Sequence, residues 1–303
     1  MASILAELPL RGAGGEPVDF RRTLHSHGVA SLPPNRVDAE ARTLEVTLPV
    51  SATGARTLRV GEGRRDHARV ELLGRAVGER TAARLLAQLR HMLRLDDDLS
   101  GFYAVAAGDE QLAWAAAGAG RMLRSPTVFE DVVKTICTTN CAWGGTVRMV
   151  TALVDHLGAA APTGARAFPA AAAIAAAPDE FFRDVARAGY RGAYLQSLAS
   201  SVASGELDLE ELNDRDLPDE EVEARLLALP GVGPYAAAHV MMTSLGRYSR
   251  LILDSWTRPT YARLTGRKAS DRTIQRRFAR YGEFAGLAFW LLLTRGWVEE
   301  RPV

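Results

Sequence analysis

The sequence of 303 residues lacks the features that mark several classes of protein. Its two cysteines, Cys137 and Cys141, are too few for an iron–sulfur cluster or a four-cysteine zinc site. Their spacing instead predicts two reduced thiols on one face of a helix. The most apolar stretch, residues 284–293, is too short to cross a bilayer, and residues 1–10 lack the charged start and long apolar run of a secretory signal. We therefore expect a cytoplasmic protein with no membrane partner.

The chain also lacks an excess of charge of one sign, since it contains 37 lysines and arginines and 36 aspartates and glutamates. A nucleic-acid coat protein or a polybasic membrane binder would be strongly positive, so any basic surface must be local. Hydrophobic residues make up 47% and charged residues 24% of the chain, a balance typical of a globular protein. This balance excludes a disordered, collagen-like or disulfide-stapled chain, and the length corresponds to about two domains.

Residues 1–115 predict a small mixed α/β domain. Residues 44–50 alternate between apolar and polar side chains, which predicts a half-buried strand. Residues 57–60 and 69–73 are shorter candidate strands separated by glycine-containing turns, so an antiparallel meander is the simplest arrangement. Residues 79–95 then follow a helical period with one apolar stripe, formed by Leu85, Leu86, Leu89, Met92 and Leu93.

Residues 116–303 predict a mostly α-helical domain, which makes the fold class α+β. Pro126 and Glu130 mark a helix start, and residues 128–136 supply the buried face of that helix. The alanine-rich residues 159–178, broken by prolines, predict a linker around one short helix. Further helices are predicted over residues 180–188, 190–204, 219–229, 234–245, 260–264, 271–281 and 284–297.

The most informative segment is Leu229-Pro230-Gly231-Val232-Gly233-Pro234-Tyr235, which predicts a hairpin between two helices within residues 229–237. Gly231 and Gly233 can take positive φ and let the backbone approach a ligand closely. Pro234 suits the first turn of the second helix, whose exposed N–H groups and dipole attract an anion such as a DNA phosphate. An ordinary helix–helix corner with a glycine turn explains the same residues equally well.

Asp254 is the candidate catalytic residue. It directly follows the apolar residues 251–253 and lies 21 residues after Gly233. A single carboxylate at the edge of a buried element suits catalysis, whereas the same position suits an N-cap of a helix over residues 255–264. The two roles are compatible.

Together, the hairpin segment and Asp254 resemble the signature of the helix-hairpin-helix (HhH-GPD) DNA glycosylase superfamily, L-P-G-[VI]-G followed by an aspartate about twenty residues later. The resemblance extends over residues 125–297 and reaches the N-terminal sheet. It implies that Asp254 acts at the sugar of an extruded nucleotide. It also implies a hairpin that binds the DNA backbone, with a monovalent cation on hairpin carbonyls. The residues concerned are Gly231, Val232 and Gly233 for DNA, and Leu229 and Val232 for the cation.

Two further segments resemble the oxoguanine DNA glycosylase branch of this superfamily. Residues 125–140, which end in Ile136-Cys137-Thr138-Thr139-Asn140, are similar to its helix ending in I-C-S-S-N. This implies that Asn140 enters the space left by the flipped base. Gly189-Tyr190-Arg191-Gly192-Ala193-Tyr194 resembles G-Y-R-A-R-Y, which implies that Tyr190 wedges into the base stack and Arg191 reads the orphaned base. Gly145 stands where that branch has a second arginine, so strict selection for an opposite cytosine is not implied.

Tyr235 departs from this branch. It stands where lyase-competent members place a lysine that forms a Schiff base, which a phenol cannot form. We therefore predict hydrolysis of the glycosidic bond without strand cleavage. An aromatic residue here, and the ending Leu293-Thr294-Arg295-Gly296-Trp297, resemble the 3-methyladenine DNA glycosylase branch, where the ring faces the extruded base.

The resemblance implies a base pocket around Tyr235, to which we add His239, Trp143 and Trp256. His239 lies one helical turn beyond Tyr235 and shares its face, although core packing is the alternative for both. The iron–sulfur branch is excluded because no cysteine follows Cys141, and the chemistry needs no metal or organic cofactor.

The expected partner is double-stranded DNA containing damaged bases, bound by a monomer. Arg258 and a cluster of basic side chains further along the chain are candidate DNA contacts, and a solvated basic face is the alternative. The cluster consists of Arg263, Arg267, Lys268, Arg272, Arg276, Arg277 and Arg280. The leading hypothesis is a monofunctional glycosylase for alkylated purines. The alternatives are an oxidised-purine glycosylase without lyase activity and a non-catalytic DNA-binding protein.

Overall fold

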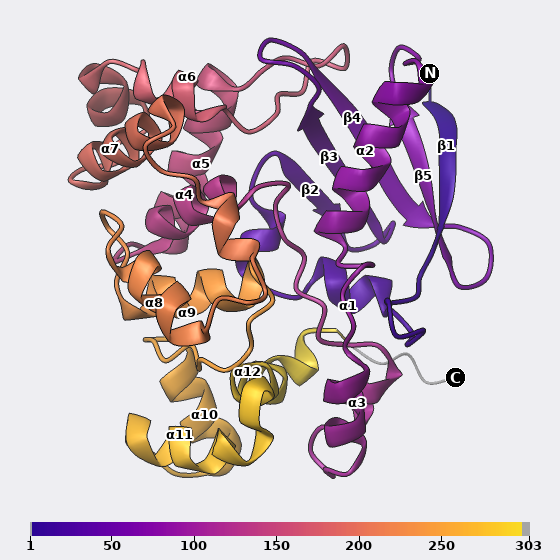
Figure 1. Cartoon of the computed structure of the whole chain (residues 1–303), viewed down its shortest axis with the longest axis vertical. Coiled ribbons are helices and arrows are strands. Elements are labelled where there is room, and N and C mark those ends of the chain that lie inside the picture. The colour runs from indigo at the N-terminus through magenta and orange to yellow at the C-terminus, as the bar shows by residue number, and fades with distance from the viewer. Residues whose placement is uncertain (1, 299–303) are drawn as a thin grey trace.

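The computed structural model describes residues 2–298, in which a five-stranded antiparallel sheet is followed by a helical region (Figure 1). This arrangement confirms the predicted α+β fold class. The strands run in the order β1-β5-β4-β3-β2. Their bounds are β1 (Ala2–Pro9), β2 (Asn35–Asp38), β3 (Thr43–Pro49), β4 (Ala55–Glu62) and β5 (His67–Leu73).

The three central strands match the predicted meander, whereas β1 and β2 were not predicted. β3 and β4 pair in register, with Leu44 opposite Val60, and Val60 also faces Val70 of β5. These apolar side chains are fully buried and pack with Leu85 and Leu89 of α2 (Glu79–Met92). The edge strands β1 and β2 lack this alternation because most of their residues are exposed or only half-buried, so their pairing depends on the sheet already being present.

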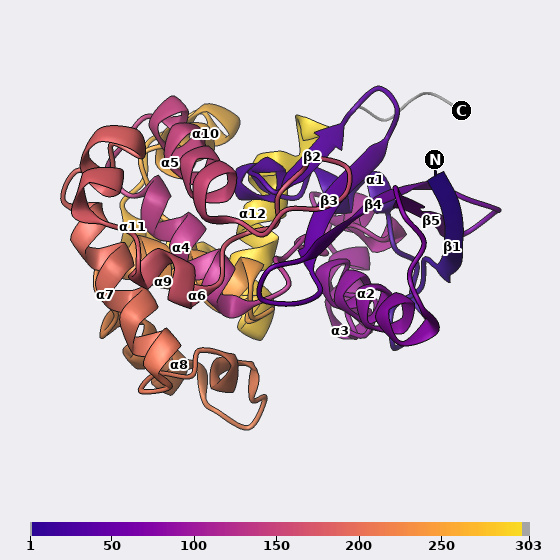
Figure 2. The same ribbon diagram turned by 90° about the horizontal axis from the view of Figure 1, so that it is seen from above.

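Twelve α-helices are described within residues 2–298, and Figure 2 shows most of them gathered beside the sheet. Besides α2, they are α1 (Phe20–Leu24), α3 (Ser100–Ala107), α4 (Val128–Thr138), α5 (Trp143–Leu157), α6 (Ala171–Ala175), α7 (Arg191–Ser204), α8 (Asp219–Leu227), α9 (Pro234–Thr243), α10 (Thr257–Thr265), α11 (Asp271–Phe278) and α12 (Ala285–Thr294). Where a helix over residues 180–188 was predicted, the chain forms only a short π-helix, Phe181–Val185.

The start of α4 differs from the prediction by a few residues. The helix begins at Val128, and the Oγ1 atom of Thr127 caps it by accepting the N–H of Glu130 at 3.2 Å. Pro126 therefore lies before the cap and not inside the first turn. A threonine cap satisfies a backbone donor that a proline at that position leaves open.

The prediction that both cysteines share one helix face is wrong. α4 ends at Thr138, so Cys137 lies in the helix and Cys141 lies in the connection that follows. Both thiols are free, and burial raises the pKa of Cys137 to about 12, which keeps that thiol protonated.

The helical region has two apolar cores. One is formed mainly by α4, α5, α7, α8 and α9, and the other by α3, α10, α11 and α12. Phe102 of α3 belongs to the second core together with Phe278 and Phe289. A boundary at residue 115 stays a prediction, and α3, which precedes it, packs with the C-terminal helices.

The buried side chain of Arg94 anchors α9 to the rest of the molecule. Arg94 follows α2, and its Nη2 atom donates to the carbonyls of Thr243 and Ser244 at 2.6 and 2.8 Å. Its Nε atom donates to the carbonyl of Met122 at 2.8 Å. These bonds satisfy carbonyls at the C-terminal end of α9 and fix that helix against the sheet side of the fold. Within residues 2–298, none of the helices has the length and apolarity needed to span a bilayer.

Candidate active site

A cleft of about 890 Å³ lies where four segments of the helical region meet. These segments are the α4–α5 connection, the start of α7, the α8–α9 hairpin and the loop before α10, whose helices share one side of the molecule in Figure 1. The cleft is lined by Thr138, Thr139, Asn140, Cys141, Ala142, Tyr190, Tyr194, Gly231, Gly233, Pro234, Tyr235, Ala236, Leu253, Asp254, Ser255 and Arg258.

The hairpin forms between α8 and α9 as predicted, but its two glycines differ in backbone conformation. Gly231 has φ +79°, and a Cβ atom there would lie 2.8 Å from Cδ2 of Tyr194. Gly233 is extended, with φ −105°, and a Cβ atom there would meet nothing within 4 Å. Of the two glycines that can take positive φ, only Gly231 does so; Gly233 is the N-cap of α9 and takes the extended conformation usual for caps. Val232 is buried, so its side chain anchors the hairpin in the core.

Asp254 lines the cleft, and its carboxylate accepts backbone N–H groups at the start of α10; the helix begins at Thr257, so its N-cap residue is Trp256 and not Asp254 as predicted. Its Oδ1 atom accepts the N–H groups of Trp256 and Thr257 at 2.8 and 2.6 Å, and the Oγ1 atom of Thr257 accepts the N–H of Asp254 at 2.8 Å. The Oδ2 atom makes no hydrogen bond to any residue in the described part of the chain. One oxygen thus holds the carboxylate in place, and the other remains for a ligand.

Tyr235 stands beside Asp254 on the cleft wall. The hydroxyl of Thr138 donates to the carbonyl of Thr135 at 2.6 Å, so the phenol of Tyr235 donates to Thr138 Oγ1 at 3.3 Å. Burial raises the pKa of Tyr235, and the nearby charge of Asp254 raises it further. The ring is therefore a neutral aromatic surface with its hydroxyl oriented.

His239 lies in the core behind Tyr235 and is not on the cleft wall. Its ring is 5.9 Å from that of Tyr235 and meets the edge of His27 at 5.7 Å. The Nδ1 atom lies 3.4 Å from Oγ1 of both Thr135 and Thr243. Burial lowers the pKa of His239 to about 3, so the imidazole is neutral.

The two tryptophans proposed for the base pocket do not line this cleft either. Trp256 turns toward Trp290 and Trp297, with ring centroids 5.6 and 5.4 Å away. Trp143 begins α5, is 48% exposed and lies over Gly28. Their part in base recognition stays a prediction.

The residues expected to fill the space of a flipped base lie together at one end of the cleft. Asn140 has φ +47°, and its Nδ2 atom donates to the hydroxyl of Tyr190 at 3.4 Å. Tyr190 is 54% exposed, and the guanidinium of Arg191 lies 4.6 Å from its ring centroid. Arg191 itself is buried and donates from Nε to the carbonyl of Thr139 at 3.0 Å. Arg191 therefore braces the α4–α5 connection and is not on the cleft wall.

Comparison with known proteins gives a related sequence and several related structures. No family model matches the sequence. The chain is 29% identical over 192 residues to the N-glycosylase/DNA lyase OGG1 of Arabidopsis thaliana, which covers 57% of this chain and 52% of that protein. The chain thus spans about half the length of the curated relative that it matches.

Solved structures match over nearly the whole chain. The 3-methyladenine DNA glycosylase of Archaeoglobus fulgidus superposes with a TM-score of 0.74 at 22% identity, over 96% of this chain and 98% of that one. The Clostridium acetobutylicum 8-oxoguanine glycosylase/lyase, in complex with double-stranded DNA containing cytosine opposite 8-oxoG, gives 0.69 at 18% identity, over 92% of each chain. The chain has the fold of the helix-hairpin-helix DNA glycosylases. Both branches that the sequence resembles are among these structures.

Within this helix-hairpin-helix glycosylase fold, Tyr194 is a cleft residue for which no role was predicted. It lies one turn after Tyr190 on α7, and the two rings meet edge to face at 5.8 Å. The same ring lies against Gly231, so Tyr194 contacts both the exposed Tyr190 and the hairpin. The spacing of four between two tyrosines on a predicted helix was the available signal.

The basic residues proposed to contact DNA differ in whether they line the cleft and in whether they have an acidic partner. Arg258 lines the cleft and pairs with Asp271 through two contacts of 2.8 Å. Arg280 instead pairs with Asp109 at 2.7 Å, and Arg277 donates to the hydroxyl of Tyr261 at 2.9 Å. The other members of the cluster are exposed and lie outside the cleft, namely Arg263, Arg267, Lys268, Arg272 and Arg276.

Proposed function

We propose that this protein is a monofunctional DNA N-glycosylase of base excision repair, which hydrolyses the N-glycosidic bond of an alkylated purine and leaves an abasic site. One observation carries the proposal: a single cleft holds Asp254, the aromatic Tyr235 and the backbone of the hairpin. We further propose double-stranded DNA with damaged bases as the partner of a monomer. The expected cytoplasmic location stays a prediction.

The hairpin provides the DNA contact in this proposal. Gly231 and Gly233 line the cleft, and the first turn of α9 presents backbone N–H groups with the positive end of the helix dipole. A phosphate of the DNA backbone is the ligand that suits this end. The carbonyl of Leu229 already accepts the N–H of Val232 at 3.2 Å and keeps a second lone pair. We propose that this lone pair and the carbonyl of Val232 contact a monovalent cation.

Asp254 carries the chemistry. Cleavage of an N-glycosidic bond develops positive charge on the sugar, by analogy with other glycoside hydrolyses. We assign two roles to the Oδ2 atom of Asp254: it stabilises the positive charge on the sugar, and it accepts a proton from the attacking water. That proton then passes to solvent. Because an N-alkylated purine is already cationic, it leaves as a neutral base and needs no acid. The ring of Tyr235 favours such a base through a cation–π contact.

The positions of the lysines support a reaction without strand cleavage. The chain contains only Lys134 and Lys268. Lys134 is 1% exposed and pairs with Glu130 at 2.6 Å in the core, and Lys268 is exposed in the α10–α11 connection. Neither lines the cleft, so within the described residues no lysine amine is placed to form a Schiff base with the sugar.

An oxidised-purine glycosylase without lyase activity is the second candidate. The arrangement of Asn140 beside Tyr190 favours it, as does the relative from Arabidopsis named above. Arg191 weighs against opposite-base reading, because its guanidinium is buried and already bonded to the carbonyls of Ala188 and Thr139.

The deciding experiment uses duplexes that each carry one methyladenine, hypoxanthine, oxoguanine or uracil. We expect hot alkali to reveal abasic sites in the methyladenine duplex, with no strand breaks before alkali. Breaks without alkali would contradict the proposed hydrolysis, and excision of oxoguanine alone would favour the second candidate.

Asp254→Asn separates a glycosylase from a non-catalytic DNA-binding protein. The amide oxygen can still accept the N–H groups of Trp256 and Thr257, so these hydrogen bonds at the start of α10 persist. We expect excision to fall by about a thousandfold or more, because a charge that stabilises the transition state is lost. Binding to abasic DNA should stay within a few fold. Undiminished excision would remove Asp254 from the reaction.

A further inference from the structure

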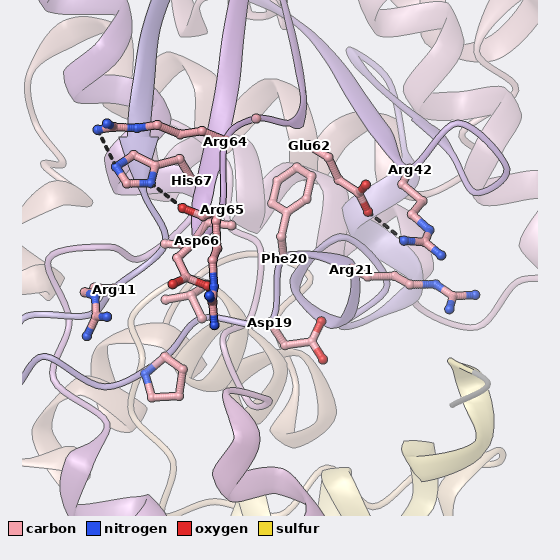
Figure 3. Close-up of a pocket in the computed structure, with 14 residues that line it drawn as sticks. Arg11, Asp19, Phe20, Arg21, Arg42, Glu62, Arg64, Arg65, Asp66 and His67 are labelled. Atoms are coloured by element: carbon pink, nitrogen blue, oxygen red, sulfur yellow. Dashed lines mark hydrogen bonds and ion pairs between the residues drawn. The ribbon is translucent and has the colours of Figure 1, made fainter. Parts of the chain in front are cut away.

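A second cavity, of about 640 Å³, lies on the sheet side of the molecule. It is bounded by the loop after β1, the start of α1 and the turn between β4 and β5 (Figure 3). Figures 1 and 2 place β5 on the side away from α7 and α8, which border the proposed active site. Among the described residues, the two cavities share no lining side chain.

The walls of this cavity are rich in positive charge. Five arginines and His67 line it, against three carboxylates. Two of these carboxylates already have partners: Glu62 pairs with Arg42 at 2.6 Å, and Asp19 accepts the N–H of Arg22 at 2.9 Å as the cap of α1. Asp66 is the remaining carboxylate, and it makes no side-chain hydrogen bond within residues 2–298.

Besides Arg64, whose guanidinium donates to His67, two of the arginines have no acidic partner within residues 2–298. Neither Arg11 nor Arg65 has a carboxylate within 4 Å among residues 2–298, although Arg11 donates to the carbonyl of Gly15 at 3.3 Å. Figure 3 shows both side chains on the same side of the cavity. Two guanidinium groups without acidic partners attract a ligand that brings its own negative charge.

Three hydrogen bonds restrain the turn that carries Arg65. The Nη2 atom of Arg64 donates to Nε2 of His67 at 2.8 Å, and Nδ1 of His67 donates to the carbonyl of Arg65 at 2.9 Å. The backbone N–H of His67 donates to the carbonyl of Arg64 at 2.9 Å. These bonds fix the backbone of Arg65 before any ligand arrives, which lowers the entropy lost on binding.

We propose that this cavity binds a small phosphate ester, whose phosphate group is held by Arg11 and Arg65. Planar guanidinium groups suit phosphate because they donate two parallel N–H bonds. The cavity volume lies in the range of small-molecule sites, and the apolar residues Leu10, Val18 and Phe20 give the organic part of an ester a surface to contact. This site is independent of the proposed glycosylase activity.

Titration calorimetry of the full chain with adenosine monophosphate, at low ionic strength, tests the proposal. We expect Arg65→Ala to weaken binding by about tenfold or more, since a charged hydrogen-bond pair is lost. Asp66→Asn should tighten binding by a few fold, because a repelling carboxylate leaves a position with φ +59° that asparagine also tolerates. Arg267→Ala, an exposed arginine outside both cavities, is the matched control and should leave binding unchanged.

Opposite effects of Arg65→Ala and Asp66→Asn would support the site, with thermal melts to show that each variant is folded. Equal binding of uncharged adenosine would overturn the role of the phosphate. No heat from adenosine monophosphate at millimolar concentration, or equal affinities in all variants, would overturn the site itself. So would a result in which Arg65→Ala weakens only the binding of duplex DNA.

Discussion

At Asp254, a structural role at the start of α10 and a proposed catalytic role use different oxygens of one carboxylate. The two N–H donors at the start of α10 fix Oδ1, so the orientation of Oδ2 is set by the backbone and not by a flexible rotamer. The sequence left both roles open for this residue. The geometry supports them together, because the loop before α10 also borders the cleft.

Tyr194 is expected to couple the exposed Tyr190 to the hairpin. Its ring touches both Tyr190 and Gly231, and its hydroxyl makes no hydrogen bond to a described residue. We therefore expect Tyr194→Ala to weaken binding to lesion-containing duplex by about tenfold, and Tyr194→Phe to behave as wild type. Binding is measured by fluorescence anisotropy with a duplex labelled at one end.

A double-mutant cycle gives the control for this prediction. If Tyr194 acts through Tyr190, the losses in Tyr194→Ala and Tyr190→Ala should not add in the double variant. Additive losses would mean that the two tyrosines bind DNA independently.

At the scale of the element, the hairpin owes its shape to Gly231 more than to Gly233. An alanine at residue 231 needs φ near +79° and brings its Cβ atom against the ring of Tyr194. We expect Gly231→Ala to lower the free energy of unfolding by about 1–3 kcal/mol. Gly233→Ala is the matched control and should cost less than about 1 kcal/mol, since its backbone is extended and its surroundings are open. Urea unfolding compares the two, and equal losses would contradict this difference.

Most helices and the central strands of this protein followed from local patterns, whereas α1, α3 and α5 were not predicted. α9 and the hairpin match the prediction because glycine and proline constrain the backbone within a few residues. β1 and β2 were not predicted because an edge strand is stabilised by its neighbouring strand, which is β5 for β1 and β3 for β2. In the case of β1, that neighbour lies far away in the sequence. The end of α4 at Thr138 was missed because the chain turns there through the left-handed Asn140, whose side chain bonds to Tyr190, the residue before α7.

At the scale of the whole molecule, Arg94 joins the sheet side to α9. Arg94→Met would leave the carbonyls of Met122, Thr243 and Ser244 without this donor in the interior. We expect the free energy of unfolding to fall by about 3–5 kcal/mol. Arg90→Ala is the control and should cost below about 1 kcal/mol, because Arg90 pairs with Asp96 on the surface. A loss as small as that of Arg90→Ala would contradict the anchoring role.

Three histidines make the free energy of unfolding depend on pH. Burial lowers the pKa of His27 to about 4, of His91 to about 4 and of His239 to about 3, while an unfolded chain keeps a value near 6.5. As pH falls below 6.5, the unfolded state therefore binds protons before the folded state, and stability is lost. We expect the free energy of unfolding to fall by about 2 kcal/mol per histidine between pH 7 and 5. Urea unfolding at a series of pH values measures this, and a constant or rising value toward pH 5 would contradict it.

The sequence by itself determined the central strands, most of the helices, the hairpin and the position of Asp254 after an apolar run, because each depends on residues close together in the chain. Only the tertiary structure decided which predicted residues meet. It brought Asn140, Tyr190 and Asp254 to one cleft, and it placed His239 and Arg191 in the interior. Whether a side chain faces a cleft or a core depends on how distant helices pack, and packing is a property of volumes and contacts that no short stretch of sequence contains.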